Sequence, residues 1–422
     1  MRTTVAALIA VCTVTLLVGC PHKPTGPIGP GPAELDYTKP LPPGQLALRK
    51  ITDPRDIPNF TVACSDLTNL RKAVENSLDY MAKPSSQKFF PYGEITHAQA
   101  LASLKAFDAI LASGMAPAQM NQTIRQQFDV YISVGCDNKG TVLYTGYYTP
   151  IFDASPTRQG RFQYPIHKAP ANLVKGEDGT ALGMRTASGQ LVPCPTRAQI
   201  EADPAMEANA LAYLGDPFEV YIATVQGSVK LRMPDGQIAN MGYTANNGYD
   251  YVSVSKAMVD DGKIPAKGVS LQAMIAYFKA HPDQVKTYTD KNRRYVFFAP
   301  GGDGPRGSLN EPVIPLRSIA TDKSIFPRVS VAFLSTTLPR RLTTGVQDLE
   351  YKAFALDQDS GQAIRAAGRA DVYMGVGDQA GDLAGRTLQE GRLYYLFLKP
   401  SSPGPLTPTA PPAPLPTDQP TR

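Results

Sequence analysis

The carboxylates towards the C-terminal end of the chain are the side chains best suited to chemistry. Asp359 and Asp371 lie 12 residues apart, and the stretch between them is rich in small residues, so the two could meet across one cleft. Four glycines, at 375, 377, 381 and 385, follow Asp371 within a short distance. Glycine permits tight loops and a close approach of backbone to a ligand. The pattern therefore predicts a cleft in which two carboxyl groups lie close to a bound ligand.

Two other kinds of site are disfavoured by spacing. The glycines follow the pattern G-x-G-x-x-x-G late in the chain without a surrounding βαβ unit, which argues against dinucleotide binding. The sequence has no C-x-x-C pair, and its four histidines, at 22, 97, 167 and 281, form no ligand cluster. We therefore expect neither a metal site nor a cofactor.

The composition narrows the class of protein further. The 422 residues include 39 Pro and 35 Gly, and only 19% are charged, which favours turns and β structure over charged helices. The net charge of +5 comes without a Lys/Arg stripe, so nucleic acid is not an expected partner. Because Trp is absent, any stacking on sugar rings must come from Tyr or Phe, and Tyr147, Tyr148 and Tyr373 are the candidates.

The elements that would position the carboxylates change in kind along the chain. The region 64–135 is predicted to be helical, with one helix ending at Pro84, a second capped by Thr96 and a third starting near Pro117. After Gly135, short strands alternate with Gly/Pro turns, a pattern typical of β-barrels. A hairpin is expected across Pro234-Asp235-Gly236, and Ser270 is expected to cap a short helix. The predicted strands are 141–149, 218–225, 229–233, 238–241, 295–299, 314–320, 329–334, 351–356, 372–374 and 393–398.

Both ends of the chain have their own composition. Residues 1–19 have the pattern of a signal peptide, and Leu17-Val18-Gly19-Cys20 resembles the lipobox of bacterial lipoproteins, in which Cys20 carries the lipid. An ordinary secretory signal or a buried apolar strand is the alternative. Residues 20–55 are predicted to be a Pro-rich tether and residues 401–422 a disordered tail. Pro21 follows the lipobox instead of Asp, which points to an outer-membrane lipoprotein facing the periplasm.

The remaining cysteines leave two possibilities open. In an oxidising periplasm, Cys64, Cys136 and Cys194 allow one disulfide and one odd thiol, and Cys64–Cys136 is the preferred pair because it flanks the helical region. Three free thiols are nearly as plausible.

Several segments in order resemble the membrane-bound lytic murein transglycosylase A family. The resemblance covers roughly residues 140–398, and it departs from the family at Val229 and at Asn310-Glu311, where the family has glycines. The matching segments are Gly146-Tyr-Tyr-Thr149-Pro150, Thr157-Arg158-Gln159-Gly160, Phe162-Gln163-Tyr164-Pro165, Val225-Gln226-Gly227-Ser228, Tyr295-Val-Phe-Phe298, Arg317-Ser-Ile-Ala-Thr-Asp322 and Asp371-Val-Tyr373-x-Gly375-x-Gly377-x-x-Ala380-Gly381.

The resemblance implies a mainly β fold with a helical N-terminal part. A double-psi β-barrel domain would comprise residues 56–154 and 270–400, with a smaller β domain, 155–269, inserted into it. A glycan would lie in the groove between the two domains.

The resemblance also implies a reaction. Such an enzyme would cleave the MurNAc–GlcNAc β-1,4 bond of peptidoglycan without water and leave 1,6-anhydro-N-acetylmuramic acid ends, as part of cell-wall turnover. Asp371 would be the catalytic acid/base, with Asp359 as the second catalytic residue. To donate a proton at neutral pH, Asp371 needs a raised pKa, and either burial or the nearby like charge of Asp359 would raise it. The expected substrate contacts are Tyr148, Thr149, Arg158, Gln226, Gly227, Ser228, Tyr373 and Gly375.

The candidate site residues also have purely structural interpretations, and the protein has alternative functions. Asp359 is as plausible a turn residue, Thr149 and Ser228 could be satisfied hydroxyls, and Asp378 and Asp382 are expected to be solvated charges. A peptidoglycan-binding lipoprotein without activity and a hydrolytic muramidase are the alternative functions. The expected partners are glycan strands, the outer membrane through the lipid anchor, and other cell-wall enzymes.

Overall fold

The computed structural model describes residues 35–176, 181–265, 269–302, 304–361 and 363–400. The predicted signal peptide, the predicted lipidation site Cys20, most of the predicted tether and the predicted C-terminal tail lie outside the described residues. Within the described ranges, every helix is too short or too polar to cross a bilayer.

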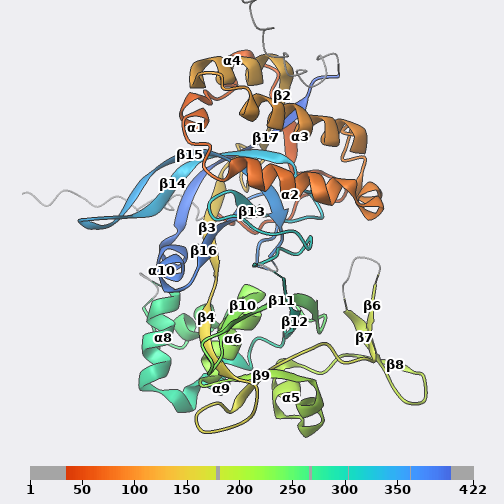
Figure 1. The fold of residues 1–422 in the computed structure, drawn as a ribbon, viewed down its shortest axis with the longest axis vertical. Helices are drawn as coiled ribbons and strands as arrows, with labels where there is room; N and C mark the ends of the chain where they lie inside the picture. Colours follow the sequence, from red (N-terminus) through yellow and green to blue (C-terminus); the bar gives the residue numbers. More distant parts are fainter. Residues whose placement is uncertain (1–34, 177–180, 266–268, 303, 362, 401–422) are drawn as a thin grey trace, which may run out of the picture. The chain divides into compact units, whose positions relative to one another are not determined.

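A closed barrel of six strands forms the centre of the fold (Figure 1). Its order is β17-β14-β15-β13-β16-β3, and the ring closes because β17 also pairs with β3. Two further strands, β1 and β2, extend the sheet from β17. The bounds are β1 Leu48–Lys50, β2 Phe128–Ser133, β3 Val142–Thr149, β13 Ser318–Ala320, β14 Val331–Leu342, β15 Gly345–Asp359, β16 Arg369–Val376 and β17 Leu388–Leu398.

Helices from the N-terminal part cover this barrel and share its apolar core (Figure 1). The rings of Phe60 and Phe107 pack against Phe333 and Phe354, with centroids 4.9–5.6 Å apart. Buried aromatic pairs of this kind add to the stability that area burial provides. The helices are η1 Pro54–Asp56, α1 Thr61–Cys64, α2 Leu70–Ala82, η2 Pro84–Phe89, α3 His97–Ala112 and α4 Pro117–Gln127.

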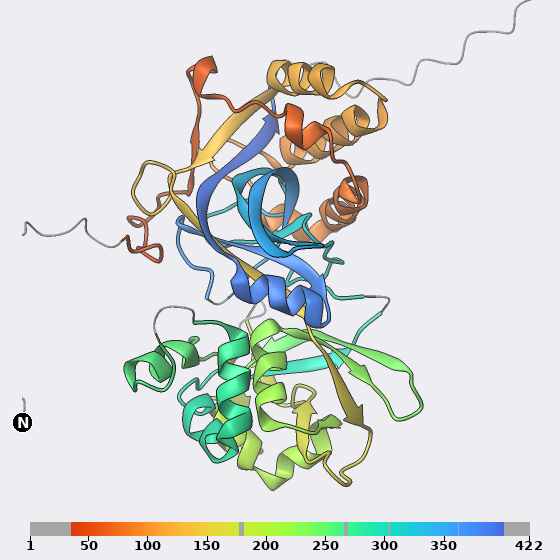
Figure 2. The same cartoon turned by 90° about the vertical axis from the view of Figure 1, so that its left-hand side faces the viewer.

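A second sheet of six strands, with its own helices, lies in the chain between β3 and β13 (Figures 1 and 2). Its order is β12-β11-β10-β4-β9-β5, and β6-β7-β8 form a separate three-stranded sheet. The strands are β4 Ile151–Ser155, β5 Tyr164–His167, β6 Leu173–Lys175, β7 Ala181–Arg185, β8 Leu191–Val192, β9 Ala210–Leu214, β10 Ser228–Arg232, β11 Ile238–Asn246 and β12 Val296–Pro300. The helices are α5 Arg197–Ala202, η3 Pro204–Asn209, α6 Pro217–Gln226, α7 Val254–Asp260, α8 Leu271–Ala280, η4 Pro282–Gln284 and α9 Val285–Thr289, and α10 Asp378–Arg386 follows β16.

One predicted strand is wrong. Residues 218–225 form the helix α6 instead, because the signals at its ends outweigh its continuous apolar run. The Asp216 side chain accepts from the backbone N–H of Phe218, Pro217 is at the first position, and Gly227 ends the helix in the left-handed region at φ +75°. A short apolar run does not by itself distinguish a buried helix from a strand.

Other predicted elements are present. Thr96 and Ser270 cap α3 and α8, and β10 and β11 form the expected hairpin. The barrel strands β14 and β15 are longer than predicted, and β13 is shorter. The range 155–269 leaves out β4 and β12, which pair in the second sheet. The domain division and the double-psi connectivity stay predictions.

The predicted disulfide is absent from the structure. Cys64, Cys136 and Cys194 are all free, in agreement with the alternative of three thiols. Cys64 is buried at the end of α1, whereas Cys136 follows β2 and packs against Gly368. Burial raises the pKa of the Cys64 thiol to about 12, so this thiol stays protonated.

The packing of α10 on β3 gives a first prediction. An added Cβ at Gly381 would lie 2.8 Å from the Tyr148 ring, whereas one at Gly385 would meet the flexible Gln272 amide. Both positions are helical, so Ala improves helix propensity in both. We expect Gly381→Ala to lower the free energy of unfolding by about 1–3 kcal/mol relative to Gly385→Ala. Urea denaturation measures the difference, and equal stabilities would show that the ring moves without cost.

Candidate active site

The strand β13 places the two predicted carboxylates on either side of itself. Its residue Ala320 pairs with Asp359 of β15 on one side and with Asp371 of β16 on the other. Two strand spacings separate the two aspartates, about 9–10 Å between their Cα atoms. The fold therefore brings Asp359 and Asp371 to one level of the barrel, as the sequence predicts.

The surroundings of Asp371 shift the titration of its carboxyl towards neutral pH. Its Oδ1 atom is buried and has no hydrogen-bond partner among the described residues. Burial raises the pKa of Asp371 to about 7, and the charge of Asp359 adds to this, while Arg369 and Thr145 lower it. A carboxyl group that titrates near neutral pH can both donate and accept a proton.

Asp359 is bound more firmly than Asp371. Its Oδ1 accepts hydrogen bonds from the backbone N–H groups of Ser308 and Ser360, each at 2.7 Å. Burial raises the pKa of Asp359, and these donors oppose the rise because they stabilise the ionised form. Gly307 packs directly on the carboxyl, so Asp359 also anchors this loop.

A buried polar network lies beneath Asp359 on the same strand. Asp357 forms an ion pair with Lys323 and accepts hydrogen bonds from Thr321 and Tyr395, each at 2.7 Å. Both charged groups are almost fully buried. A buried charge is costly unless it is paired and hydrogen-bonded, so separating these groups would be unfavourable. The network therefore holds β15 against the segment that follows β13, which carries Thr321 and Lys323.

Hydroxyl groups connect the barrel to the second sheet at Tyr373, two residues after Asp371 on β16. The Thr149 hydroxyl lies 3.0 Å from that of Tyr373 on β16 and 3.0 Å from that of Ser228 on β10. The Gln226 side chain accepts from the backbone N–H of Tyr148 at 3.1 Å. The predicted contact residues are thus brought together, and they bond to one another across the junction.

The predicted aromatic platform is mostly covered. Tyr148 is 6% exposed under α10, and Tyr373 is 1% exposed, so neither ring presents an open face for stacking. Tyr147 keeps partial exposure, and its ring centroid lies 5.1 Å from that of Tyr373. Gly375 has a φ of +116°, where a side chain would be strained, and it packs against Pro315.

Arg158 belongs to a different cluster. Its guanidinium pairs with Glu207 at 2.7 Å, donates to the Gln163 carbonyl, and lies over the Tyr213 ring. These partners all flank the second sheet, so the structure gives Arg158 a local structural role. Asp378 is exposed, and Asp382 pairs with Arg341 and Arg386 at the surface.

Four further residues near the carboxylates were not predicted. Arg369 and Thr145 both interact with Asp371, Ser308 binds Asp359, and Tyr251 of the segment before α7 interacts electrostatically with Arg369. The spacing of Arg369 and Asp371, two apart on one strand, was a usable signal, because such residues share a face. Nothing local in the sequence indicated Ser308 or Tyr251.

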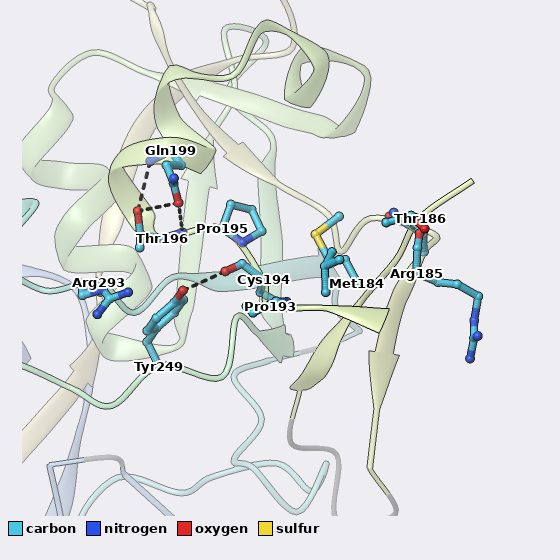
Figure 3. A pocket seen from close by; sticks show the side chains of 12 residues that line it. Met184, Arg185, Thr186, Pro193, Cys194, Pro195, Thr196, Gln199, Tyr249 and Arg293 are labelled. Carbon is cyan, nitrogen blue, oxygen red and sulfur yellow. Dashed lines mark hydrogen bonds between the residues drawn. The ribbon is translucent and has the colours of Figure 1, made fainter. Parts of the chain in front are cut away.

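A separate cavity of about 620 Å³ lies beside the small sheet β6-β7-β8 (Figure 3). Cys194, Tyr249, Arg293 and Met184 line it, and the Tyr249 hydroxyl donates to the Cys194 carbonyl at 2.9 Å. No residue of the carboxylate pair is in its wall. The described residues include no group of three or more metal-ligating side chains.

The fold is thus a closed barrel in which one strand carries a carboxyl that titrates near neutral pH. Family models match in two places, the MltA specific insert domain at residues 143–299 and the 3D domain at residues 317–397. The membrane-bound lytic murein transglycosylase A of Escherichia coli K12 is 32% identical over 278 residues, which cover 65% of this chain and 70% of that protein. The protein of that name in Vibrio cholerae is 28% identical and covers 63% and 68%.

Solved structures agree with this likeness. Escherichia coli MltA with bound chitohexaose has a TM-score of 0.64 at 26% identity, covering 87% of this chain and 97% of that one. A membrane-bound lytic murein transglycosylase from Agrobacterium tumefaciens has a TM-score of 0.70 at 23% identity, covering 83% and 98%, and shows the fold. The chain therefore belongs to the membrane-bound lytic murein transglycosylase A family, and it is an enzyme of the lytic transglycosylase class.

The raised pKa of Asp371 gives a prediction about stability. Between the usual Asp pKa near 4 and the folded value of about 7, the unfolded chain ionises while the folded protein keeps its proton. The wild type thus loses stability across this window relative to Asp371→Asn, and the difference stays constant above it. We expect the variant to be more stable by roughly 1–4 kcal/mol at pH 8, with the gap closing towards pH 4.

Urea titrations from pH 4 to 8 measure this difference. Asp79→Asn, on the exposed face of α2, is the control and should show a flat difference across the range. A flat profile for Asp371→Asn as well would mean that Asp371 is ionised in the folded protein at neutral pH.

Proposed function

We propose that this protein is a peptidoglycan lytic transglycosylase in which Asp371 is the catalytic acid and base. The observation that supports the proposal most strongly is a carboxyl whose pKa is raised to about 7 and whose buried Oδ1 has no partner among the described residues. The family supports the same reaction through relatives that bear this name.

One carboxyl is enough for such a reaction. Hydrolytic glycosidases use two, because one protonates the leaving oxygen while the other activates water or attacks the sugar. In a lytic transglycosylase the C6 hydroxyl of the N-acetylmuramic acid unit takes the place of water. The asymmetry between Asp371, with its free oxygen, and Asp359, whose Oδ1 accepts two backbone hydrogen bonds, fits this division.

The bond changes balance without an added molecule. The Asp371 proton passes to the glycosidic oxygen as the C1–O4 bond breaks, and charge of oxocarbenium type develops at C1. The C6 oxygen then bonds to C1, and its proton returns to the Asp371 carboxylate. The products are a 1,6-anhydro-N-acetylmuramic acid end and a free 4-hydroxyl, and the carboxyl is restored.

We assign Asp359 an electrostatic role. Its negative charge helps to keep Asp371 protonated and would favour a positive charge that develops at C1. Thr149, Gln226, Gly227, Ser228, Tyr373 and Gly375 would shape the wall near the bound glycan, with Tyr148 supporting it from beneath α10. Tyr147 is the ring best placed to contact a sugar, since it alone of the three candidates is partly exposed.

The expected location follows from the N-terminal sequence. We propose an outer-membrane lipoprotein anchored through Cys20, which meets glycan strands in the periplasm and acts in cell-wall turnover. The relatives' shared description as membrane-bound supports this. The Escherichia coli MltA structure with bound chitohexaose supports a glycan as the ligand.

The central test is Asp371→Asn on purified peptidoglycan. We expect the wild type to release 1,6-anhydro-muropeptides and the variant to lose activity by at least about 1,000-fold, because amide nitrogen cannot supply the proton. Mass spectrometry identifies the products, since an anhydro end is one water lighter than a hydrolytic end.

Asp378→Asn is the matched control. Asp378 is exposed at the start of α10, close in sequence to Asp371, and its loss should leave most activity. Hydrated products from the wild type would establish a muramidase. Binding to peptidoglycan without any product would establish the non-catalytic alternative.

Asp359→Asn gives a prediction of defined sign. Removing the negative charge lowers the pKa of Asp371, so the acid loses its proton at lower pH. We expect the alkaline limb of the activity profile to move down by roughly 0.5–1 pH unit, with a reduced rate at the optimum. The pH dependence of muropeptide release measures this shift. If the alkaline limb does not move, Asp359 has only a structural role, as the anchor of the loop at Gly307.

A further inference from the structure

Arg369 is a buried cation placed two residues before Asp371 on β16. Residues two apart on a strand point to the same face, so the guanidinium and the carboxyl share one side of the sheet. The Nε atom of Arg369 is buried without a hydrogen-bond partner among the described residues, as is Oδ1 of Asp371. The two groups are therefore neighbours that do not form an ion pair with each other.

Thr145 connects the two side chains. It is the register partner of Asp371 on the adjacent strand β3, and its hydroxyl accepts a hydrogen bond from Arg369 at 3.1 Å. The same hydroxyl interacts with the Asp371 carboxyl. The guanidinium is thus held beside the carboxyl by a third residue, at a distance where it acts through its charge.

The other groups around Asp371 come from three elements. Asp359 lies across β13, which itself contributes Ala320 and no charged group at this level. Tyr147 of β3 interacts with both aspartates, and Tyr251, from the second sheet's part of the chain, interacts with Arg369. Lys323 acts on Asp359 but is paired with Asp357. Arg369 is therefore the positive charge that bears most directly on Asp371.

We propose that Arg369, held by Thr145, is a positioning residue that sets the pH range over which Asp371 serves as acid. This inference rests on the proposed role of Asp371. Arg369 opposes both burial and the charge of Asp359, so it keeps the Asp371 carboxyl within reach of ionisation. A carboxyl whose ionised form is too costly is a poor acid, because donation leaves it as the carboxylate that must then take the proton from the C6 hydroxyl.

The separation of Arg369 from Asp371 also matters for the pKa of Asp371. A direct ion pair would stabilise the carboxylate and lower the pKa of Asp371 strongly, which would leave no proton to donate. In the structure the guanidinium instead donates to Thr145, and Asp371 Oδ1 stays without a partner.

The test compares Arg369→Gln, Arg369→Lys and Thr145→Val. Loss of the positive charge in Arg369→Gln raises the pKa of Asp371, so the alkaline limb of the activity profile should move up by roughly one pH unit. Arg369→Lys keeps the charge and should leave the limb close to that of the wild type. Thr145→Val should move the alkaline limb upwards by less than Arg369→Gln does. Thr145→Ser keeps the hydroxyl, so its alkaline limb should match that of the wild type.

A direct titration keeps this inference separate from the proposed function. The carboxyl resonance of Asp371 is followed by carbon-13 NMR in protein labelled at aspartate carboxyls, and it is assigned by its loss in Asp371→Asn. This reading does not depend on activity, so it stays informative if Asp371→Asn proves to be active. We expect the Asp371 midpoint to rise in Arg369→Gln by the same amount as the limb of the activity profile.

Arg392→Gln is the matched control. Arg392 lies on β17 of the same barrel and donates to a threonine, Thr141, at 2.9 Å, but it is not among the groups that act on Asp371. Its loss should leave the Asp371 midpoint unchanged. An unchanged midpoint in Arg369→Gln, or an equal shift in Arg392→Gln, would overturn the inference. Should Arg369→Gln fail to fold, an Asp371 midpoint in Thr145→Val that equals the wild-type value would overturn it as well.

Discussion

One electrostatic feature governs the site. The carboxyl of Asp371 lies on a barrel strand, and its buried Oδ1 has no hydrogen-bond partner among the described residues. Such a group costs free energy, and the rest of the site reduces that cost without removing it. Asp371 keeps a proton near neutral pH because burial and Asp359 act in one direction, while Arg369 and Thr145 act in the other. The balance of these four influences would decide whether the group can donate a proton and then accept one.

The barrel makes this balance possible because it brings separate segments to one level. The short strand β13 places Asp359 and Asp371 on its two sides, and closure through β17 and β3 adds Thr145 and Tyr147. Beneath this level, the ion pair of Asp357 with Lys323 holds β15 in place. The position of Asp371 is therefore set by paired strands on each side and not by a mobile loop.

The junction with the second sheet serves the same site from outside the barrel. Thr149 joins Tyr373 to Ser228, and Gln226 holds the backbone at Tyr148, so the end of α6 is attached to β3. The sequence predicted these residues as substrate contacts, and in the structure several of them also bond to one another. The rings of Tyr148 and Tyr373 are covered, and Arg158 pairs within the second sheet.

The sequence by itself indicated the candidate carboxylates and determined much of the local structure. The carboxylates, the glycines after Asp371, the helix caps at Thr96 and Ser270 and the hairpin at Asp235-Gly236 are local signals, because each depends on residues a few positions apart. Tertiary structure alone decided that Cys64 and Cys136 stay unpaired and that Arg369 reaches Thr145. It also decided the ionisation of Asp371, because a pKa depends on burial and on charges that only folding brings together.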